Sequence, residues 1–92
     1  MRVFLKLRGA DANGKPFEES TTTEDVSVGG FLCSCLVTLT KDAPVEVYLA
    51  SGGLERHAGT AKVVRKESTG SPVQRYGFQF VKSTSDWVLQ GK

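Results

Sequence analysis

The feature that most constrains the fold is the alternation of inward and outward residues in several short segments. Near the start of the chain, Val3, Leu5 and Leu7 fall on one face of an extended segment and the residues between them on the other. Successive side chains of a β-strand point to opposite faces, so this period predicts strands buried on one side. The segments that fit a strand by alternation or by Thr-rich composition are 2–9, 17–25, 31–40, 45–50, 54–68 and 73–81.

Turn-forming residues separate these segments. Asn13-Gly14 is a strong hairpin signal, and the later gaps are rich in Gly, Pro, Ser and Asp. About six short strands with frequent turns are typical of an antiparallel barrel or sandwich, here with a bend at Gly59. The tail has a Ser/Asp start followed by Trp-Val-Leu-Gln, which favours a short C-terminal helix over 83–90.

The same alternation predicts which side chains form the core. Residues of one face in each segment should pack together inside the barrel or sandwich, because a one-residue slip would expose the whole apolar set. The expected core includes Val3, Leu5, Leu7, Phe31, Cys33, Val37, Val47, Val63, Phe78 and Phe80.

Length and composition indicate a single globular domain over residues 1–92. The chain is 39% hydrophobic and 24% charged, which is ordinary for a folded protein, and its net charge of +2 is too weak to indicate DNA or RNA binding. It contains no apolar run long enough to span a membrane and no signal-peptide pattern. We therefore expect a reduced, cytoplasmic setting without a membrane partner.

The residue types that most often carry catalysis or bind metals are few. Cys33 and Cys35 are separated by one residue, and His57 is the only histidine, whereas zinc requires four ligands. On a strand both thiols would point into the core, so we expect buried free thiols and no metal site. His57 has no recognisable nucleophile, since Ser27 lacks the G-x-S-x-G context. These observations argue against an enzyme.

One stretch interrupts the strand pattern. The segment Asp25-Val26-Ser27-Val28-Gly29-Gly30 places an acid, a hydroxyl and two glycines between two strand-like segments. Taken alone it is explained by a turn, because Asp and Ser bond to nearby backbone and Gly accepts positive φ. The pattern D-x-S-x-x-G by itself matches many loops.

The order of features along nearly the whole chain resembles the PilZ domain, a bacterial receptor module for cyclic di-GMP. The segment "DVSVGG" matches the family's [D/N]-x-S-x-x-G motif as Asp25, Ser27 and Gly30. The segments "AKVVRKE" and "RYGFQFV" are similar to two later strands of the family. The resemblance implies a six-stranded antiparallel β-barrel, often with a C-terminal helix.

The resemblance also implies a ligand site. Arg2 matches the second arginine of the family's R-x-x-x-R motif, and the first would lie before Met1, outside this chain. The implied cyclic di-GMP contacts are therefore Arg2, Asp25, Ser27, Gly29 and Gly30, with no other cofactor. Arginine matches phosphate and the guanine edge, Asp and Ser can bond a base, and glycine leaves room. The alternative is a degenerate PilZ-like module that contacts a protein effector and binds no nucleotide.

Overall fold

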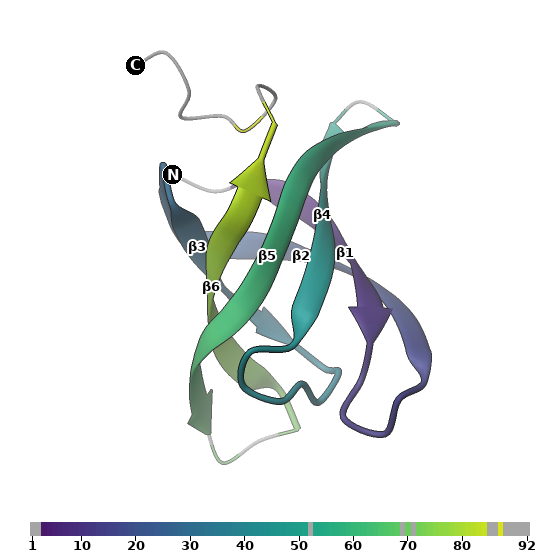
Figure 1. Cartoon of the computed structure of the whole chain (residues 1–92), viewed down its shortest axis with the longest axis vertical. Helices are drawn as coiled ribbons and strands as arrows, with labels where there is room; N and C mark the ends of the chain where they lie inside the picture. The colour runs from purple at the N-terminus through teal and green to yellow at the C-terminus, as the bar shows by residue number, and fades with distance from the viewer. Residues whose placement is uncertain (1–2, 52, 69, 71, 85–86, 88–92) are drawn as a thin grey trace.

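The computed structural model describes residues 3–51, 53–68, 70, 72–84 and 87, and these form one closed antiparallel barrel (Figure 1). The strand order is β1-β2-β3-β6-β5-β4, and β1 closes the barrel by pairing with β4. The prediction of an all-β, six-stranded barrel is therefore confirmed. The strands are β1 (Phe4–Ala10), β2 (Pro16–Ser27), β3 (Gly30–Cys35), β4 (Pro44–Ser51), β5 (Leu54–Ser68) and β6 (Gln74–Ser83).

Within the described residues no helix is long and apolar enough to cross a membrane. The helix predicted over 83–90 lies largely outside the described residues, because 85–86 and 88–90 are not among them. Ser83, at its expected start, is the last residue of β6.

The barrel interior contains the predicted core. Alternating side chains from all six strands point inward into the closed barrel. Cys33 and Cys35 are buried free thiols, with their Sγ atoms 3.9 Å apart. Of the predicted core residues, Leu5, Leu7, Phe31, Cys33, Val47, Val63 and Phe78 are buried, and Val3, Val37 and Phe80 pack partly buried against them.

The β1–β2 connection is the hairpin that the Asn13-Gly14 signal predicts. Gly14 has a φ of 80°, and its amide donates to the carbonyl of Asp11. The Asp11 carboxylate accepts the amides of Asn13 at 2.8 Å and Lys15 at 3.0 Å. A short polar side chain thus satisfies the turn backbone, as expected for an Asx-type turn.

The strand predicted over 31–40 is too long, because β3 ends at Cys35. Beyond it, side chains replace the strand ladder as hydrogen-bond partners. The Glu19 carboxylate accepts the amides of Leu36 at 2.7 Å and Val37 at 3.0 Å. The Tyr76 hydroxyl accepts the amide of Leu39 at 2.9 Å and donates to the carbonyl of Val37 at 3.0 Å. Side chains therefore pair with the amides of Leu36, Val37 and Leu39 where the strand pairing has ended.

The bend predicted at Gly59 is confirmed as a β-bulge. The β4–β5 register shifts where Val47 pairs with Gly59 and Tyr48 with His57. Gly59 has a φ of 143°, and a Cβ there would collide with the carbonyl oxygen of Lys82 on β6. Only glycine fits this close approach of two strands.

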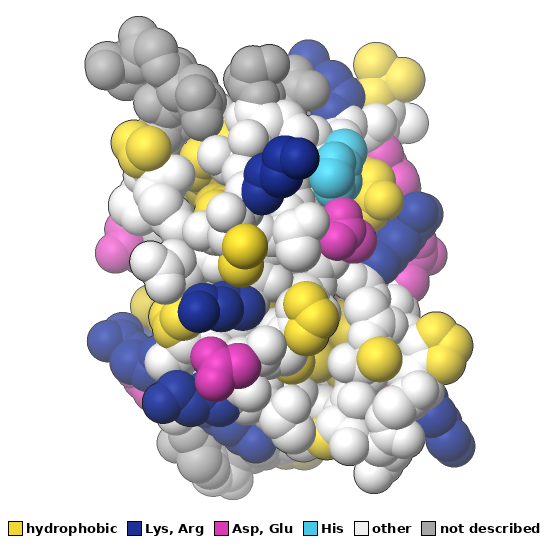
Figure 2. Space-filling model, in the orientation of Figure 1, with side chains coloured by type: hydrophobic (Ala, Val, Ile, Leu, Met, Phe, Trp, Pro, Cys, Tyr) yellow, Lys and Arg dark blue, Asp and Glu magenta, His cyan; other side chains and the backbone are white. Residues whose placement is uncertain are grey.

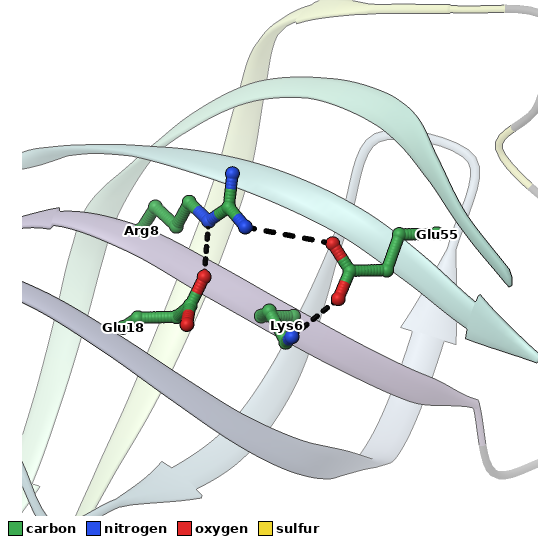
Figure 3. A network of polar contacts seen from close by, with 4 residues as sticks. All are labelled: Lys6, Arg8, Glu18 and Glu55. Atoms are coloured by element: carbon green, nitrogen blue, oxygen red, sulfur yellow. Dashed lines mark hydrogen bonds and ion pairs between the residues drawn. The ribbon is translucent and has the colours of Figure 1, made fainter. Parts of the chain in front are cut away.

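The outer face of β1 carries an ion-pair network (Figure 3). Glu55 pairs with Lys6 and, at 3.6 Å, with Arg8, which also pairs with Glu18. The hydrogen bond from Lys6 lowers the pKa of the Glu55 carboxyl, while its effect on Lys6 is to raise the pKa of the ammonium. The charge of Lys6 is thus matched by its neighbours on the barrel wall.

Candidate ligand groove at the β2–β3 turn

A bulge in β2 sets the direction of the DVSVGG side chains. Thr23 pairs with Cys33 and Asp25 with Leu32, so Glu24 is an extra residue in the β2–β3 strand pairing. Thr23 is fully buried, whereas Asp25 is exposed. Without the bulge, Asp25 would share the inward face of Thr23. The extra residue turns Asp25 and Ser27 outward and lets Val26 pack against the core.

The motif itself forms the β2–β3 turn. The Asp25 Oδ1 accepts the amide of Val26 at 3.0 Å, and the Ser27 hydroxyl donates to the carbonyl of Gly30 at 3.3 Å. The carbonyl of Gly29 accepts the amide of Phe80 on β6 at 2.8 Å. The turn is therefore fixed both internally and to the neighbouring strand.

The two glycines of the turn have different surroundings. A Cβ on Gly30 would collide with the carbonyl oxygen of Phe78, so this glycine permits the close packing of β3 on β6. Gly29 borders open space, with no atom within 4 Å of the position of a Cβ. Of the two glycines, only Gly29 therefore has free space beside its backbone.

An open groove of 370 Å³ runs from the turn across the outer face of the barrel. Cross-strand pairing places Asp25, Leu32, Gly77 and Arg65 in one row over β2, β3, β6 and β5. Three strand spacings of about 4.8 Å make the path from Asp25 to Arg65 roughly 14 Å along the curved barrel wall. Gly77 has no side chain, and the Arg65 side chain packs over it, with its Cβ 3.3 Å from the position that a Gly77 Cβ would take. The groove is lined by Asp25, Val26, Ser27, Gly29, Gly30, Phe31, Leu32, Arg65, Gly77, Phe78 and Gln79.

Arg65 was not among the predicted site residues. A second bulge explains its position, because Val63 pairs with Phe78 and Arg65 with Gly77, which leaves Val64 as an extra residue. The bulge turns Arg65 outward, just as the bulge at Glu24 turns Asp25. No sequence pattern marks either bulge.

Glu67 links Arg65 to a second arginine. Its carboxylate lies 3.2 Å from the Arg65 Nε and 3.7 Å from an Arg75 terminal nitrogen. Arg75 also pairs with Glu24 at 2.6 Å. Figure 2 shows Lys and Arg side chains beside an acidic one over the lower parts of β5 and β6. The face therefore offers cations already aligned by carboxylates, which suits recognition of an anion with hydrogen-bonding edges.

Arg2, the remaining predicted contact, lies outside the described residues. Its neighbour Val3 is tied to β2, because the Thr23 hydroxyl accepts the Val3 amide at 2.9 Å and the Thr23 amide donates to the Val3 carbonyl at 3.0 Å. The β1–β2 hairpin thus brings Val3 within two residues of Asp25 along β2. That Arg2 joins Asp25 and Ser27 stays a prediction.

A larger hollow of 810 Å³ lies elsewhere, between the start of β1 and the β4–β5 turn. It is bordered by Phe4 and Leu54, whose side chains are 67% and 71% exposed. Lys6 and Glu55, which also line it, are paired with each other. Among the described residues, no group of three or more His, Cys, Asp or Glu side chains could hold a metal ion. His57 contacts Glu46 at 2.6 Å on the barrel wall.

Comparison with known proteins agrees with the fold. No curated protein and no solved structure matches the chain. The family model of the PilZ domain matches residues 1–86, which include all six strands and the DVSVGG turn. The chain therefore belongs to the PilZ domain family.

Proposed function

We propose that the protein is a cytoplasmic sensor module that binds cyclic di-GMP at the β2–β3 turn and performs no catalysis. Membership of the PilZ family, a family of cyclic di-GMP receptors, supports this function. The observation that carries it is the outward row from Asp25 and Ser27 to Arg65, whose side chain packs over Gly77 within the groove.

The groove offers the complementary groups that a guanine nucleotide requires. The Asp25 carboxylate can accept the N–H donors of a guanine Watson–Crick edge, and an arginine fork can donate to its O6 and N7. A phosphate would then lie toward Gly29, where the backbone borders open space. Each charge-assisted hydrogen bond of this kind contributes about 1.5–3 kcal/mol.

Arg2 would supply the cation on the other side of the turn. In the proposed complex it follows Val3 toward Asp25 and pairs with a phosphate or a guanine edge. An arginine four residues before Arg2 would complete the family's R-x-x-x-R motif and add a second guanidinium.

Calorimetric titration with cyclic di-GMP, with GMP as the control ligand, tests this function. Arg2→Ala and Asp25→Ala should each abolish binding in the titration, because each removes a direct contact from the turn. Lys66→Ala should leave the affinity unchanged. If the chain shows no heat of binding, an N-terminal extension that places an arginine four residues before Arg2 is titrated next. If the extended chain also shows no heat of binding, the sensor function is rejected.

A second function would then remain, that of a PilZ-like module that contacts a protein effector. The exposed Phe4 and Leu54 beside the 810 Å³ hollow favour it, because exposed apolar side chains around a concavity mark interaction sites. The two functions differ in the titration: the interaction module gives no nucleotide binding even with both arginines present.

A further inference from the structure

Trp87 lies at the end of the barrel directly against the ligand turn. It is the only tryptophan in the sequence, and its side chain is 1% exposed. Its indole Nε1 donates a hydrogen bond of 2.8 Å to the carbonyl of Ser27, sixty residues earlier. The ring centroid lies 4.7 Å from that of Phe80 and 5.6 Å from that of Phe31. A residue near the C-terminus therefore contacts the middle of the DVSVGG motif.

The backbone of the turn is held at two points from outside the β2–β3 hairpin. The Phe80 amide binds the Gly29 carbonyl, and the Trp87 indole binds the Ser27 carbonyl. Phe80 is also the ring on which Trp87 packs most closely. Phe80 thus both binds the turn and packs against Trp87. Loss of the indole would therefore weaken both hydrogen bonds that hold the turn. The outward direction of the Ser27 hydroxyl depends on the backbone that these bonds hold.

We propose that Trp87 is a positioning residue for the ligand turn. Nucleotide binding in the groove and packing of the indole against the turn then stabilise each other. This inference rests on the proposed function at the same turn. Linkage makes the effect reciprocal: if the seated indole raises the affinity for the nucleotide by some factor, the bound nucleotide favours the seated indole by that factor. The segment that contains Trp87 thereby responds to the ligand without contacting it.

The expected size follows from the hydrogen bond that the indole makes. A typical buried hydrogen bond corresponds to about a twofold to tenfold change in an equilibrium constant. Trp87→Phe removes the N–H group and keeps an aromatic ring against Phe80. We therefore expect cyclic di-GMP to bind this variant about twofold to tenfold more weakly.

Tyr76→Phe is the matched control. It also removes a polar atom from a buried aromatic residue, here the hydroxyl bonded to Val37 and Leu39 at the other end of β3. If general loss of stability were the cause, both variants would weaken binding. Positioning by Trp87 predicts that the Tyr76→Phe variant binds with unchanged affinity.

Trp87 also reports on its own state in the unmodified protein. Addition of cyclic di-GMP should reduce the quenching of its fluorescence by acrylamide, whereas GMP should not. A readout without nucleotide is amide hydrogen exchange. In Trp87→Phe the Phe80 amide, bonded to Gly29, should exchange faster relative to the global opening rate. In Tyr76→Phe the Leu39 amide should do so instead.

The outcomes separate this inference from the proposed function. If the unmodified protein binds the nucleotide, equal affinity in Trp87→Phe overturns the positioning role and leaves the function intact. If the unmodified protein does not bind, the proposed function fails, and the exchange of the Phe80 amide still decides whether Trp87 holds the turn. Unchanged exchange in Trp87→Phe would overturn that role.

Discussion

Arg65 belongs to the groove because of its place on the barrel. It is one of several basic residues on β5 and β6, and its type alone does not distinguish it from Lys66. The pairing does, because Arg65 is opposite Gly77, whereas Lys66 is opposite the inward Tyr76. Both side chains are exposed, but Arg65 lines the groove and Lys66 does not.

Arg65→Ala should weaken cyclic di-GMP binding about tenfold to hundredfold, the equivalent of one charge-assisted hydrogen bond of about 1.5–3 kcal/mol. Lys66→Ala removes the same charge from the neighbouring position and should leave the affinity unchanged. Calorimetry at two salt concentrations measures both. Equal losses that vanish at high salt would mean that Arg65 acts only through the general field of the face.

The strands show what alternation predicts and where it fails. The expected strand 54–68 and its bend at Gly59 agree with β5. The apolar residues follow the two-residue alternation on each side of Gly59, and the alternation shifts by one residue at the bend. The bulge at Glu24 leaves no such trace. The surrounding segment has Thr, Glu and Ser in both phases, so a one-residue shift changes nothing in its pattern.

The end of β3 is a second case that alternation cannot predict. Residues 36–39 continue the period of the strand, yet the partners of their backbone groups are the side chains of Glu19 and Tyr76. Neither contact is encoded locally, since these residues lie on β2 and β6. Long-range side-chain bonds therefore decide where β3 ends.

Glu19→Ala should lower the free energy of unfolding by about 1–3 kcal/mol, because the amides of Leu36 and Val37 lose their acceptor. Glu18→Ala is the control on the adjacent position. Its exposed pair with Arg8 should contribute about 1 kcal/mol or less. Urea denaturation of both variants measures the difference. Equal losses would show that the Glu19 carboxylate does not hold the 36–37 backbone.

At the scale of the whole molecule, closure of the barrel brings distant segments together. Trp87 meets Ser27 only because β3 and β6 are neighbours in the sheet order, although their connection spans β4 and β5. The tail pattern favoured a helix start and gave no sign of a buried indole. The turn at DVSVGG could be predicted from the sequence, whereas the positions of Arg65 and Trp87 beside it required the topology. That the turn residues bind a ligand stays a prediction.

The barrel should lose stability at alkaline pH. The hydrogen bond with Cys35 and burial raise the pKa of the Cys33 thiol above its ordinary 9.0, and burial raises the pKa of Tyr76 above 10.0. Above pH 9 the unfolded chain releases protons that the folded chain retains. The stabilisation is therefore complete below pH 9 and is lost as the pH rises beyond it.

Urea midpoints measured at neutral pH and above pH 9 check this expectation. The midpoint should fall as the pH rises, and the fall should be shallower in Cys33→Ala, which lacks the buried thiol. The neutral-pH midpoint of each protein serves as its own reference. A midpoint that stays constant to pH 10 would contradict the effect of the buried thiol.

The bulges also affect how the length of this sequence can change during evolution. Deleting Glu24 would preserve every letter of the DVSVGG motif and would keep Asp25 and Ser27 outward, because Asp25 would then directly follow the inward Thr23. Loss of Val64 would likewise keep Arg65 outward, directly after the inward Val63. A lineage can therefore gain or lose either bulge residue through a single-codon change without reversing the side chains that line the groove.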